Sequence, residues 1–337
     1  ELGASAYEKR GVAVVVPHWD ETKCIQCNQC AYVCPHATIR PFAMTEDEAA
    51  AAPEATRTLD AMGPKAKGMK FTMAVSPLDC MGCTNCVKVC PKGALEMVPT
   101  EQEMDQQPVW DYMVENVSEK KELIAANVKG SQFKQPYLEF SGSCAGCAET
   151  TYIKLLSQLF GDRMYIGNAA GCSSAISGGA PILPYCKDSQ GRGPAWEHSL
   201  FEDNAEFAYG FFHAQDAIRK ELLIRLESMK DADIAPAEIE DYINNWNDGE
   251  KSRAVSDALI AALEKCEQTE DVSYILENRE YLSKKSIWAI GGDGWAYDIG
   301  FGGIDHVMAQ NRDVNLLVLD TEVYSNTGGQ SSKSTPT

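Results

Sequence analysis

Eight of the thirteen cysteines fall into two copies of one spacing, and a proline follows each copy. The first copy comprises Cys24, Cys27, Cys30 and Cys34, and the second comprises Cys80, Cys83, Cys86 and Cys90. Two residues between thiolates let one short loop present three sulfurs to three irons of a cubane. The spacing therefore predicts two [4Fe–4S] clusters, which transfer one electron at a time.

Each copy has the C-x₂-C-x₂-C-x₃-C-P spacing of bacterial ferredoxins, in which the fourth cysteine binds the other cluster. The expected ligand sets are Cys24, Cys27, Cys30 and Cys90 for one cluster, and Cys80, Cys83, Cys86 and Cys34 for the other. Zinc and disulfides are the alternatives. Structural zinc uses paired C-x₂-C knuckles, and a third cysteine at the same short spacing, twice over, does not fit that pattern.

Bulk composition narrows the class of protein. A length of 337 residues suffices for two or three domains, and a net charge of −19 disfavours a nucleic-acid partner. No apolar run reaches the roughly 18 residues of a membrane span, and no signal peptide is visible. Many cysteines without a secretion signal indicate a reducing cytoplasm. We expect a cytoplasmic protein that binds neither nucleic acid nor membrane.

The amino-terminal half is expected to hold an α+β ferredoxin-like domain at residues 21–98. A lead-in segment, 1–20, contains a strand-like run at 12–16 that Pro17 ends. An insert at 41–70 separates the two cysteine runs and predicts a surface helix, from 45 to 62, broken at Pro53. Residues 99–136 resemble a wrapping linker.

The remaining residues, 137–337, are expected to form an α/β domain. Strands are predicted at 163–166, 286–290 and 314–319, with helices at 147–160 and 297–310. Buried strands alternating with helices indicate a parallel sheet covered by helices on both faces. A charged helical insertion, 201–282, carries two amphipathic stripes.

A second group of chemically useful residues follows two of these strands. Gly291-Gly-Asp293-Gly-Trp295 follows one strand, and Thr321-Glu-Val323-Tyr-Ser-Asn326 follows the next. Open α/β sheets bind ligands at the carboxyl ends of their strands, where glycines admit a diphosphate and an aspartate can bind Mg²⁺. We expect thiamine diphosphate with Mg²⁺, bound by the Asp293 carboxylate, the Thr321 hydroxyl and the Val323 carbonyl. A polar turn that binds nothing is the alternative.

Three further cysteines lie in glycine-flanked loops of this domain, and they could bind a third cluster. They are Cys144, Cys147 and Cys172. A fourth ligand is needed. Cys186 and Cys266 are candidates by count, although Cys266 ends an amphipathic helix and is expected to be a small buried hydrophobe.

Taken together, these motifs resemble pyruvate:ferredoxin (flavodoxin) oxidoreductase of the single-chain type, over essentially all 337 residues. The resemblance implies three [4Fe–4S] clusters, thiamine diphosphate and Mg²⁺. It implies that the thiamine contacts are Glu149, Cys172, Gly292, Asp293, Gly294, Trp295, Thr321, Glu322, Val323, Tyr324, Ser325 and Asn326. Asn326 matches a polar group that faces the substrate, and Asp313 and Asn315 match a calcium site of some members.

By the same resemblance, the fourth ligand of the third cluster comes after Thr337, which disfavours Cys186 and Cys266. The chain starts without Met and ends within a Ser/Thr/Gly loop, so we expect a segment of a longer enzyme, truncated within the thiamine domain and inactive alone. The remainder of the same polypeptide would be a partner, and a homodimer is expected.

The implied reaction converts pyruvate and coenzyme A to acetyl-CoA and CO₂ and passes electrons to ferredoxin or flavodoxin, in an anaerobic or facultatively anaerobic bacterium. Two alternatives stay open. One is a related oxidoreductase acting on indolepyruvate or 2-oxoglutarate. The other is a non-catalytic electron-transfer protein with a degenerate thiamine fold.

Overall fold

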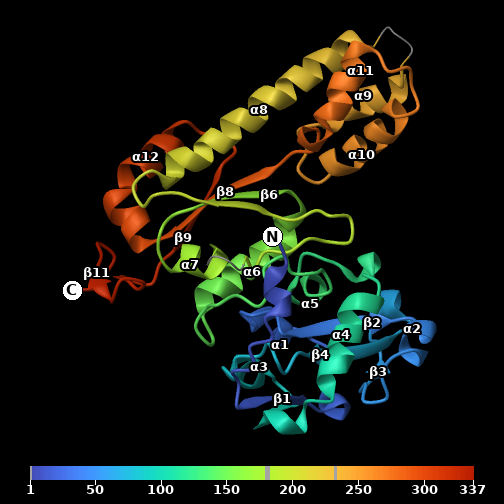
Figure 1. Ribbon diagram of the computed structural model, residues 1–337, viewed down its shortest axis with the longest axis vertical. Coiled ribbons are helices and arrows are strands. Elements are labelled where there is room, and N and C mark those ends of the chain that lie inside the picture. The colour runs from blue at the N-terminus through green and yellow to red at the C-terminus, as the bar shows by residue number, and fades with distance from the viewer. Residues whose placement is uncertain (1, 179–182, 231–233) are drawn as a thin grey trace. The chain divides into compact units, whose positions relative to one another are not determined.

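The computed structural model describes residues 2–178, 183–230 and 234–337, and it contains two compact units (Figure 1). The first unit comprises Glu1–Asp162 and Ser173–Pro194. The second comprises Arg163–Cys172 and Ala195–Thr337. Among the described helices, none combines the length and apolarity needed to cross a membrane.

Two small antiparallel sheets organise the first unit. In one, β1 (Val15–Trp19) pairs with β5 (Leu95–Pro99); in the other, the strand order is β2-β4-β3. The bounds of the latter strands are Ile39–Met44 for β2, Lys70–Val75 for β4 and Leu59–Asp60 for β3. Apolar side chains of both sheets, including Trp19 and Phe71, form a core that also takes in Cys34 and Cys86. The sheets therefore pack directly against the cysteine runs.

Short helices connect and cover these strands. The α-helices are α1 (Gln29–Val33), α2 (Glu46–Ala50), α3 (Asn85–Val89), α4 (Gln106–Asn116), α5 (Val128–Ser131), α6 (Ala148–Phe160) and α7 (Cys172–Gly178). The 3₁₀ turns are η1 (Ala4–Tyr7), η2 (Glu21–Lys23), η3 (Pro64–Ala66), η4 (Thr100–Gln102), η5 (Lys121–Leu123) and η6 (Gly161–Arg163). The contact between α1 and α3 joins the two cysteine runs.

The predicted strand at 12–16 was misplaced. Strand β1 starts at Val15 and continues through Pro17, which lies opposite Met97 in β5. A proline has no N–H to donate, but each strand of a two-stranded sheet has a free edge that tolerates this loss. Val12 and Val14 precede the strand, and their side chains are exposed. Pro17 therefore belongs to the strand and does not end it.

Two predicted segments differ from expectation: the helix of the insert is shorter, and the linker at 99–136 is more ordered. The helix predicted at 45–62 is observed only as α2, and Leu59 and Asp60 form strand β3 instead. The predicted linker contains α4, whose Trp110 and Met113 side chains are fully buried. A wrapping segment would leave such large apolar groups in water, so α4 forms part of the core.

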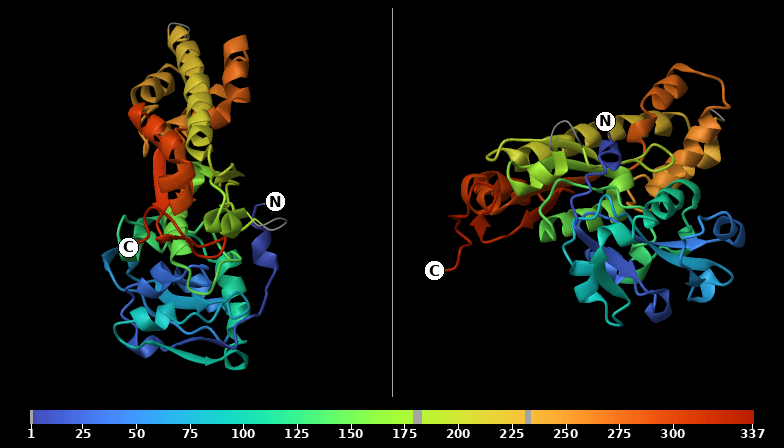
Figure 2. Two further views of the ribbon diagram at one scale, coloured as in Figure 1. Left: turned by 90° about the vertical axis from the view of Figure 1, so that its left-hand side faces the viewer. Right: turned by 60° about the horizontal axis from the view of Figure 1, so that its bottom comes forward.

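A parallel four-stranded sheet organises the second unit, in the order β7-β6-β8-β9. The bounds are Ala195–His198 for β7, Met164–Asn168 for β6, Ser286–Gly292 for β8 and Asn315–Leu319 for β9. The three predicted strands are thus confirmed within two residues at either end. The long helix α8 (Asn204–Ser228) contacts β6 and β8, and α12 (Phe301–Ala309) packs on α8 (Figure 2).

The described residues of the predicted helical insertion form four α-helices. Helix α8 extends from the sheet to α9 (Pro236–Asn245), α10 (Ser252–Leu263) and α11 (Glu270–Glu277), which η7 (Arg279–Tyr281) connects back to β8 (Figure 1). These helices share a core of their own that includes Leu222, Tyr242 and Leu259. The π-helix η8 (Gly294–Ile299) precedes α12, and a short hairpin, β10 (Val323–Tyr324) with β11 (Gln330–Ser331), follows β9.

Candidate iron–sulfur centres and cofactor site

The two cysteine runs repeat the same backbone conformation. The second residue after the first cysteine has a positive φ in both runs, 54° at Gln26 and 66° at Gly82. The fourth residue after it repeats this feature, with 60° at Asn28 and 69° at Thr84. Left-handed residues turn the chain sharply, so each loop curls around a small volume. The side chains at these positions differ, so the repeat is signalled in the sequence by the cysteine spacing and the proline after it.

The curled loops direct backbone N–H groups toward sulfur. The N–H of Gln26 donates to Cys24 Sγ at 3.4 Å, and the N–H of Gly82 donates to Cys80 Sγ at 3.4 Å. Glycine is favoured at position 82, because an added Cβ would lie 3.1 Å from the Val15 carbonyl oxygen at a positive φ. Donors of this kind stabilise a thiolate over a thiol, so the loops are suited to metal-bound sulfur.

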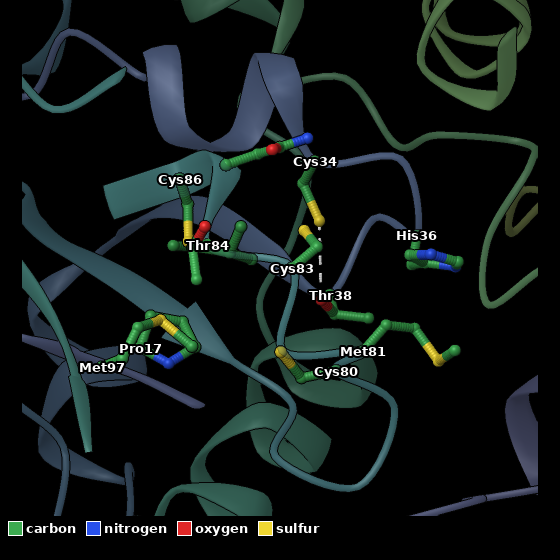
Figure 3. Close-up of a pocket in the computed structure, with 12 residues that line it drawn as sticks. Pro17, Cys34, His36, Thr38, Cys80, Met81, Cys83, Thr84, Cys86 and Met97 are labelled. Atoms are coloured by element: carbon green, nitrogen blue, oxygen red, sulfur yellow. Dashed lines mark hydrogen bonds between the residues drawn. The ribbon is translucent and has the colours of Figure 1, made fainter. Parts of the chain in front are cut away.

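Four cysteines from both runs border one pocket. Its lining includes Cys34, Cys80, Cys83 and Cys86, together with Pro17, His36, Thr38, Met81, Thr84 and Met97 (Figure 3). These four are the ligand set predicted for the second cluster, in which the first run contributes its last cysteine. Burial raises the pKa of Cys80 to about 12, and the neighbouring Cys34 and Cys83 act in the same direction. A cluster would therefore have to displace protons from these thiols.

The other four cysteines also lie within electrostatic reach of one another. Burial raises the pKa of Cys24 and Cys30, and Cys27 and Cys90 add to both shifts. The N–H of Ala94 donates to Cys90 Sγ at 3.3 Å. This is the ligand set predicted for the first cluster.

Neither set converges on a point. Among the residues that the structure describes, no three His, Cys, Asp or Glu side chains are close enough to bind a single metal ion. A [4Fe–4S] cluster does not need such convergence, since its four thiolates surround a cube rather than one ion.

The thiols proposed for a third cluster belong to different units. In the first unit, Cys144 is exposed and Cys147 forms the N-cap of α6, where its N–H donates to the Cys144 carbonyl at 3.1 Å. Glu149 lies in the first turn of that helix. Cys172 belongs to the second unit, where its Sγ lies 3.3 Å from Ser325 Oγ. The last contact brings Cys172 to the predicted cofactor loop.

The two remaining cysteines have separate environments. Cys186 is buried, and its Sγ donates to the Pro136 carbonyl at 3.3 Å. Burial raises the pKa of Cys186 well above its ordinary value. Cys266 follows α10 and is partly exposed, contrary to the predicted burial, and its Sγ donates to the Ala262 carbonyl at 3.3 Å. Helix α10 ends at Leu263, so Cys266 lies beyond the helix and is not part of its buried face.

The three predicted Mg²⁺ ligands lie together in the second unit. Strand β8 leads directly into Asp293, whose Oδ1 accepts the Thr321 N–H at 2.9 Å and the Thr321 hydroxyl at 3.4 Å. That hydroxyl lies 3.0 Å from the Val323 carbonyl oxygen. The ends of the parallel strands are in register, since Gly292 lies opposite Leu319. The register places the two polar loops side by side.

Asp293 is a buried carboxylate surrounded by donors. Its Oδ2 accepts the hydroxyls of Ser334 at 2.7 Å and Ser332 at 3.2 Å. Burial acts to raise the pKa of Asp293, but the hydrogen bonds from Thr321 and these serines outweigh it, so the pKa lies below its ordinary value. The carboxylate is therefore ionised and able to bind a cation. Sequence reasoning missed both serines, because a Ser/Thr/Gly loop carries no spacing signal.

The glycine turn after β8 is tightly packed. A Cβ on Gly294 would lie 2.1 Å from Tyr324 Cε1 and 2.4 Å from Phe201 Cζ. Trp295 is fully buried in the core of this unit, and its Nε1 has no hydrogen-bond partner in the described part of the chain. The Trp295 side chain therefore packs the turn against the core of this unit.

The second loop is partly open to solvent. Thr321, Glu322, Ser325 and Asn326 are exposed, whereas Val323 and Tyr324 are partly buried in the β10 strand. The Tyr324 hydroxyl donates to Asp298 at 2.6 Å, which raises the pKa of Tyr324 to about 12. Asn326 Oδ1 lies 4.0 Å from Cys172 Sγ.

The residues of the implied calcium site have protein partners. The Asp313 carboxylate pairs with Lys284 Nζ at 2.6 Å, and the Asn315 amide donates to the Ile287 carbonyl at 2.9 Å. Asn315 is the first residue of β9, and Asp313 lies two residues before it.

Known proteins that are similar in sequence to this chain support the interpretation of its motifs. Residues 23–94 match the 4Fe-4S dicluster domain. The chain is 51% identical to pyruvate:ferredoxin oxidoreductase from Moorella thermoacetica, over all of this chain and 30% of that protein. It is 49% identical to pyruvate-flavodoxin oxidoreductase from Enterobacter agglomerans, over 99% of this chain and 29% of that protein. The chain resembles one segment of the pyruvate:ferredoxin and pyruvate-flavodoxin oxidoreductases. The resemblance predicted from the motifs is thus confirmed.

Other relatives extend the comparison. The chain is 46% identical to the mitochondrial NADP⁺ pyruvate dehydrogenase of Euglena gracilis, over 99% of this chain and 19% of that protein. The chain spans about 30% of the length of the oxidoreductases that it matches. Along that segment, a dicluster ferredoxin domain precedes a parallel four-stranded sheet with helices.

Proposed function

We propose that this chain is the electron-carrying and Mg²⁺-diphosphate-binding segment of a pyruvate:ferredoxin or pyruvate-flavodoxin oxidoreductase. In the whole reaction, pyruvate and coenzyme A give acetyl-CoA, CO₂, a proton and two electrons. The electrons leave one at a time for ferredoxin or flavodoxin. The match of residues 23–94 to the dicluster domain is the observation that carries this proposal. The remainder of the polypeptide would supply the residues that bind pyruvate and coenzyme A.

The chain's cysteines hold the clusters in two interleaved sets. Curled loops supply N–H donors that favour thiolates, while the packed sheets exclude water from Cys34 and Cys86. Each loop would therefore hold its sulfurs in position for a cluster, which would supply one-electron transfer when bound. Cys144, Cys147 and Cys172 would hold a third cluster, completed by a ligand from outside residues 1–337.

The loops after β8 and β9 would hold the coenzyme. Asp293, Thr321 and Val323 supply three oxygens of the hard type that Mg²⁺ prefers, and the Asp293 carboxylate is ionised. When bound, thiamine diphosphate supplies the chemistry of 2-oxoacid decarboxylation. The chain's own task is to fix the diphosphate and to keep Cys172 beside the loop.

Iron analysis tests the cluster part. Anaerobically purified protein should be brown, contain acid-labile sulfide and give [4Fe–4S] signals in low-temperature electron paramagnetic resonance after reduction. Cys86→Ala should lose about four irons per chain, whereas Cys266→Ala should lose none. A colourless, iron-free protein would overturn the proposal.

Calorimetry tests the coenzyme part. Thiamine diphosphate should bind only with Mg²⁺, and Asp293→Ala should abolish the heat of binding, while Asp305→Ala, on the exposed side of α12, should preserve it. Equal heats of binding for the two variants would show that Asp293 is not part of the coenzyme site. Full iron content without any coenzyme binding by the wild type would favour a pure electron carrier.

A further inference from the structure

One lysine is buried next to the cysteine runs. Lys154 is only 1% exposed and lies on α6, two turns after the N-cap residue Cys147. A lysine is almost never fully buried unless it is paired. Its surroundings should therefore contain a compensating group.

Helix α6 binds the carboxyl end of α1 through two side chains. The Lys154 ammonium donates to the Ala31 carbonyl at 2.5 Å and to the Tyr32 carbonyl at 3.1 Å. Thr151, one turn earlier, donates to the Val33 carbonyl at 3.4 Å. The last carbonyls of a helix lack intrahelical donors, and a cation is favourable there. Three successive carbonyls of α1 thus accept hydrogen bonds from one face of α6, and the Ala31 carbonyl also accepts the Cys34 N–H at 3.3 Å.

Hydrogen bonds to carbonyls do not neutralise the charge of Lys154. In the described part of the chain no carboxylate forms an ion pair with it, and the nearby Arg40 is itself a cation. Burial lowers the pKa of Lys154 to about 8, whereas Cys34 and Cys30 act to raise it. An isolated buried ammonium is costly, so the fold implies an anion on the side of these cysteines.

The helix that Lys154 caps connects the two predicted clusters. Cys30 lies within α1 and belongs to one ligand set, while Cys34 caps the same helix and belongs to the other. Four thiolates give each cluster a net negative charge. We propose that the Lys154 ammonium is the buried counter-charge shared by the two clusters and that it raises the reduction potential of both. This inference rests on the proposed function, because it requires bound clusters.

The physical argument concerns the added electron. Reduction places one electron on a cluster and makes its charge more negative by one. A fixed cation at short range in a medium of low dielectric constant stabilises the reduced state more than the oxidised one. Net charge and hydrogen bonding are among the factors that set the potentials of such clusters. Lys154 is a positioning and tuning residue in this scheme, since it contacts α1 and not the irons.

Redox titration of the full, cluster-loaded chain tests the inference. Electron paramagnetic resonance should show both midpoint potentials shifted to more negative values in Lys154→Met and Lys154→Gln, and near the wild-type values in Lys154→Arg. The Gln variant removes the charge and keeps an N–H donor, on a side chain one atom shorter. Thr151→Val should weaken the helix contact without shifting the potentials. Lys88→Met, an exposed lysine on α3, should shift them less than Lys154→Met.

The outcomes separate this inference from the proposed function. Absence of iron from the wild type would remove the clusters and the proposed function with them. Full iron content with unchanged potentials in Lys154→Met or Lys154→Gln would overturn the role of Lys154 alone. If both neutral variants lose their clusters, retention in Lys154→Arg would support the counter-charge, and loss there as well would reject it.

Discussion

At the scale of single residues, the glycine turn after β8 leaves no space for a side chain. Gly294 faces the rings of Tyr324 and Phe201, and these rings lie 6.0 Å apart. Tyr324 belongs to the loop that carries Thr321 and Val323. The packing of one glycine therefore fixes the distance between the two loops that would bind the coenzyme.

We predict that Gly294→Ala destabilises the second unit by about 1–3 kcal/mol, the usual cost of overpacking. It should also abolish Mg²⁺-dependent binding of thiamine diphosphate, because Tyr324 must move. Chemical denaturation and calorimetry measure the two effects. Gly302→Ala is the matched control, since a Cβ on Gly302 meets nothing within 4 Å. Normal coenzyme binding by Gly294→Ala would show that the loop spacing is not critical.

At the scale of elements, the short helix α2 depends on one carboxylate. Glu48 completes a capping box with Thr45, and it also accepts hydrogen bonds from Ser118 and Lys120. Burial acts to raise the pKa of Glu48, but the bonds from Lys120, Ser118 and Thr45 lower it to about 2. One side chain thus stabilises a helix start and anchors a distant segment.

We predict that Glu48→Gln lowers the free energy of unfolding by about 1–3 kcal/mol at pH 7, because Gln keeps an acceptor for the Thr45 N–H but loses the charge that pairs with Lys120. Because the folded pKa is depressed, the contribution of Glu48 is present above pH 4.5 and is lost as the pH falls toward 2. Denaturation of wild type and variant at several pH values should show the difference shrinking in that window. Glu46→Gln, in the same helix turn, should have little effect. A difference independent of pH would argue against ionisation as its source.

Element types were more predictable than the contacts that position the sites. The apolar runs that form β8 and β9 have clear ends, although β9 is mostly half-buried rather than buried as predicted, and the cysteine spacing specified both cysteine loops. The left-handed residues Gln26 and Asn28 carry no such signal, because any polar residue can occupy those positions at some cost. The bounds of β1 were also not predictable, because they are set by its pairing with β5 and not by Pro17, which lies within the strand. Lys154 was missed because a helical lysine is ordinarily solvated.

At the scale of the whole molecule, the second unit combines a sheet with a separate helical core. Leu259 of α10 is fully buried among the helices α8 to α11, in a cluster that contains no residue proposed to bind iron or coenzyme. Damage to this core should therefore affect stability and leave the iron sites of the first unit intact.

We predict that Leu259→Ala lowers the free energy of unfolding by about 2–5 kcal/mol, as expected for a cavity in a packed core, with iron content unchanged. Denaturation followed by circular dichroism, together with iron analysis, measures both quantities. Ile224→Ala is the control, because Ile224 is 65% exposed on α8. Iron loss in Leu259→Ala would show that the two units are coupled more strongly than their separate cores suggest.

The interleaved ligand sets lead to a prediction about cluster identity. Cys34 belongs to the first run but lines the pocket with Cys80, Cys83 and Cys86. Cys34→Ala should therefore remove the same resonance signal as Cys86→Ala, whereas Cys30→Ala should remove the other one. If Cys34→Ala and Cys30→Ala eliminate the same signal, each run binds its own cluster.

The antiparallel pairing of β2 with β4 has a consequence for how this region tolerates change. Ile39 lies opposite Val75, and Cys34 and Cys80 are each five residues beyond that last pair, at the open end of the hairpin. The insert occupies the closed end, where β3 pairs with β4 and Glu48 bonds to Lys120. A change of length that spares these contacts should leave the backbone ladder, and with it the separation of the sulfur atoms, unchanged.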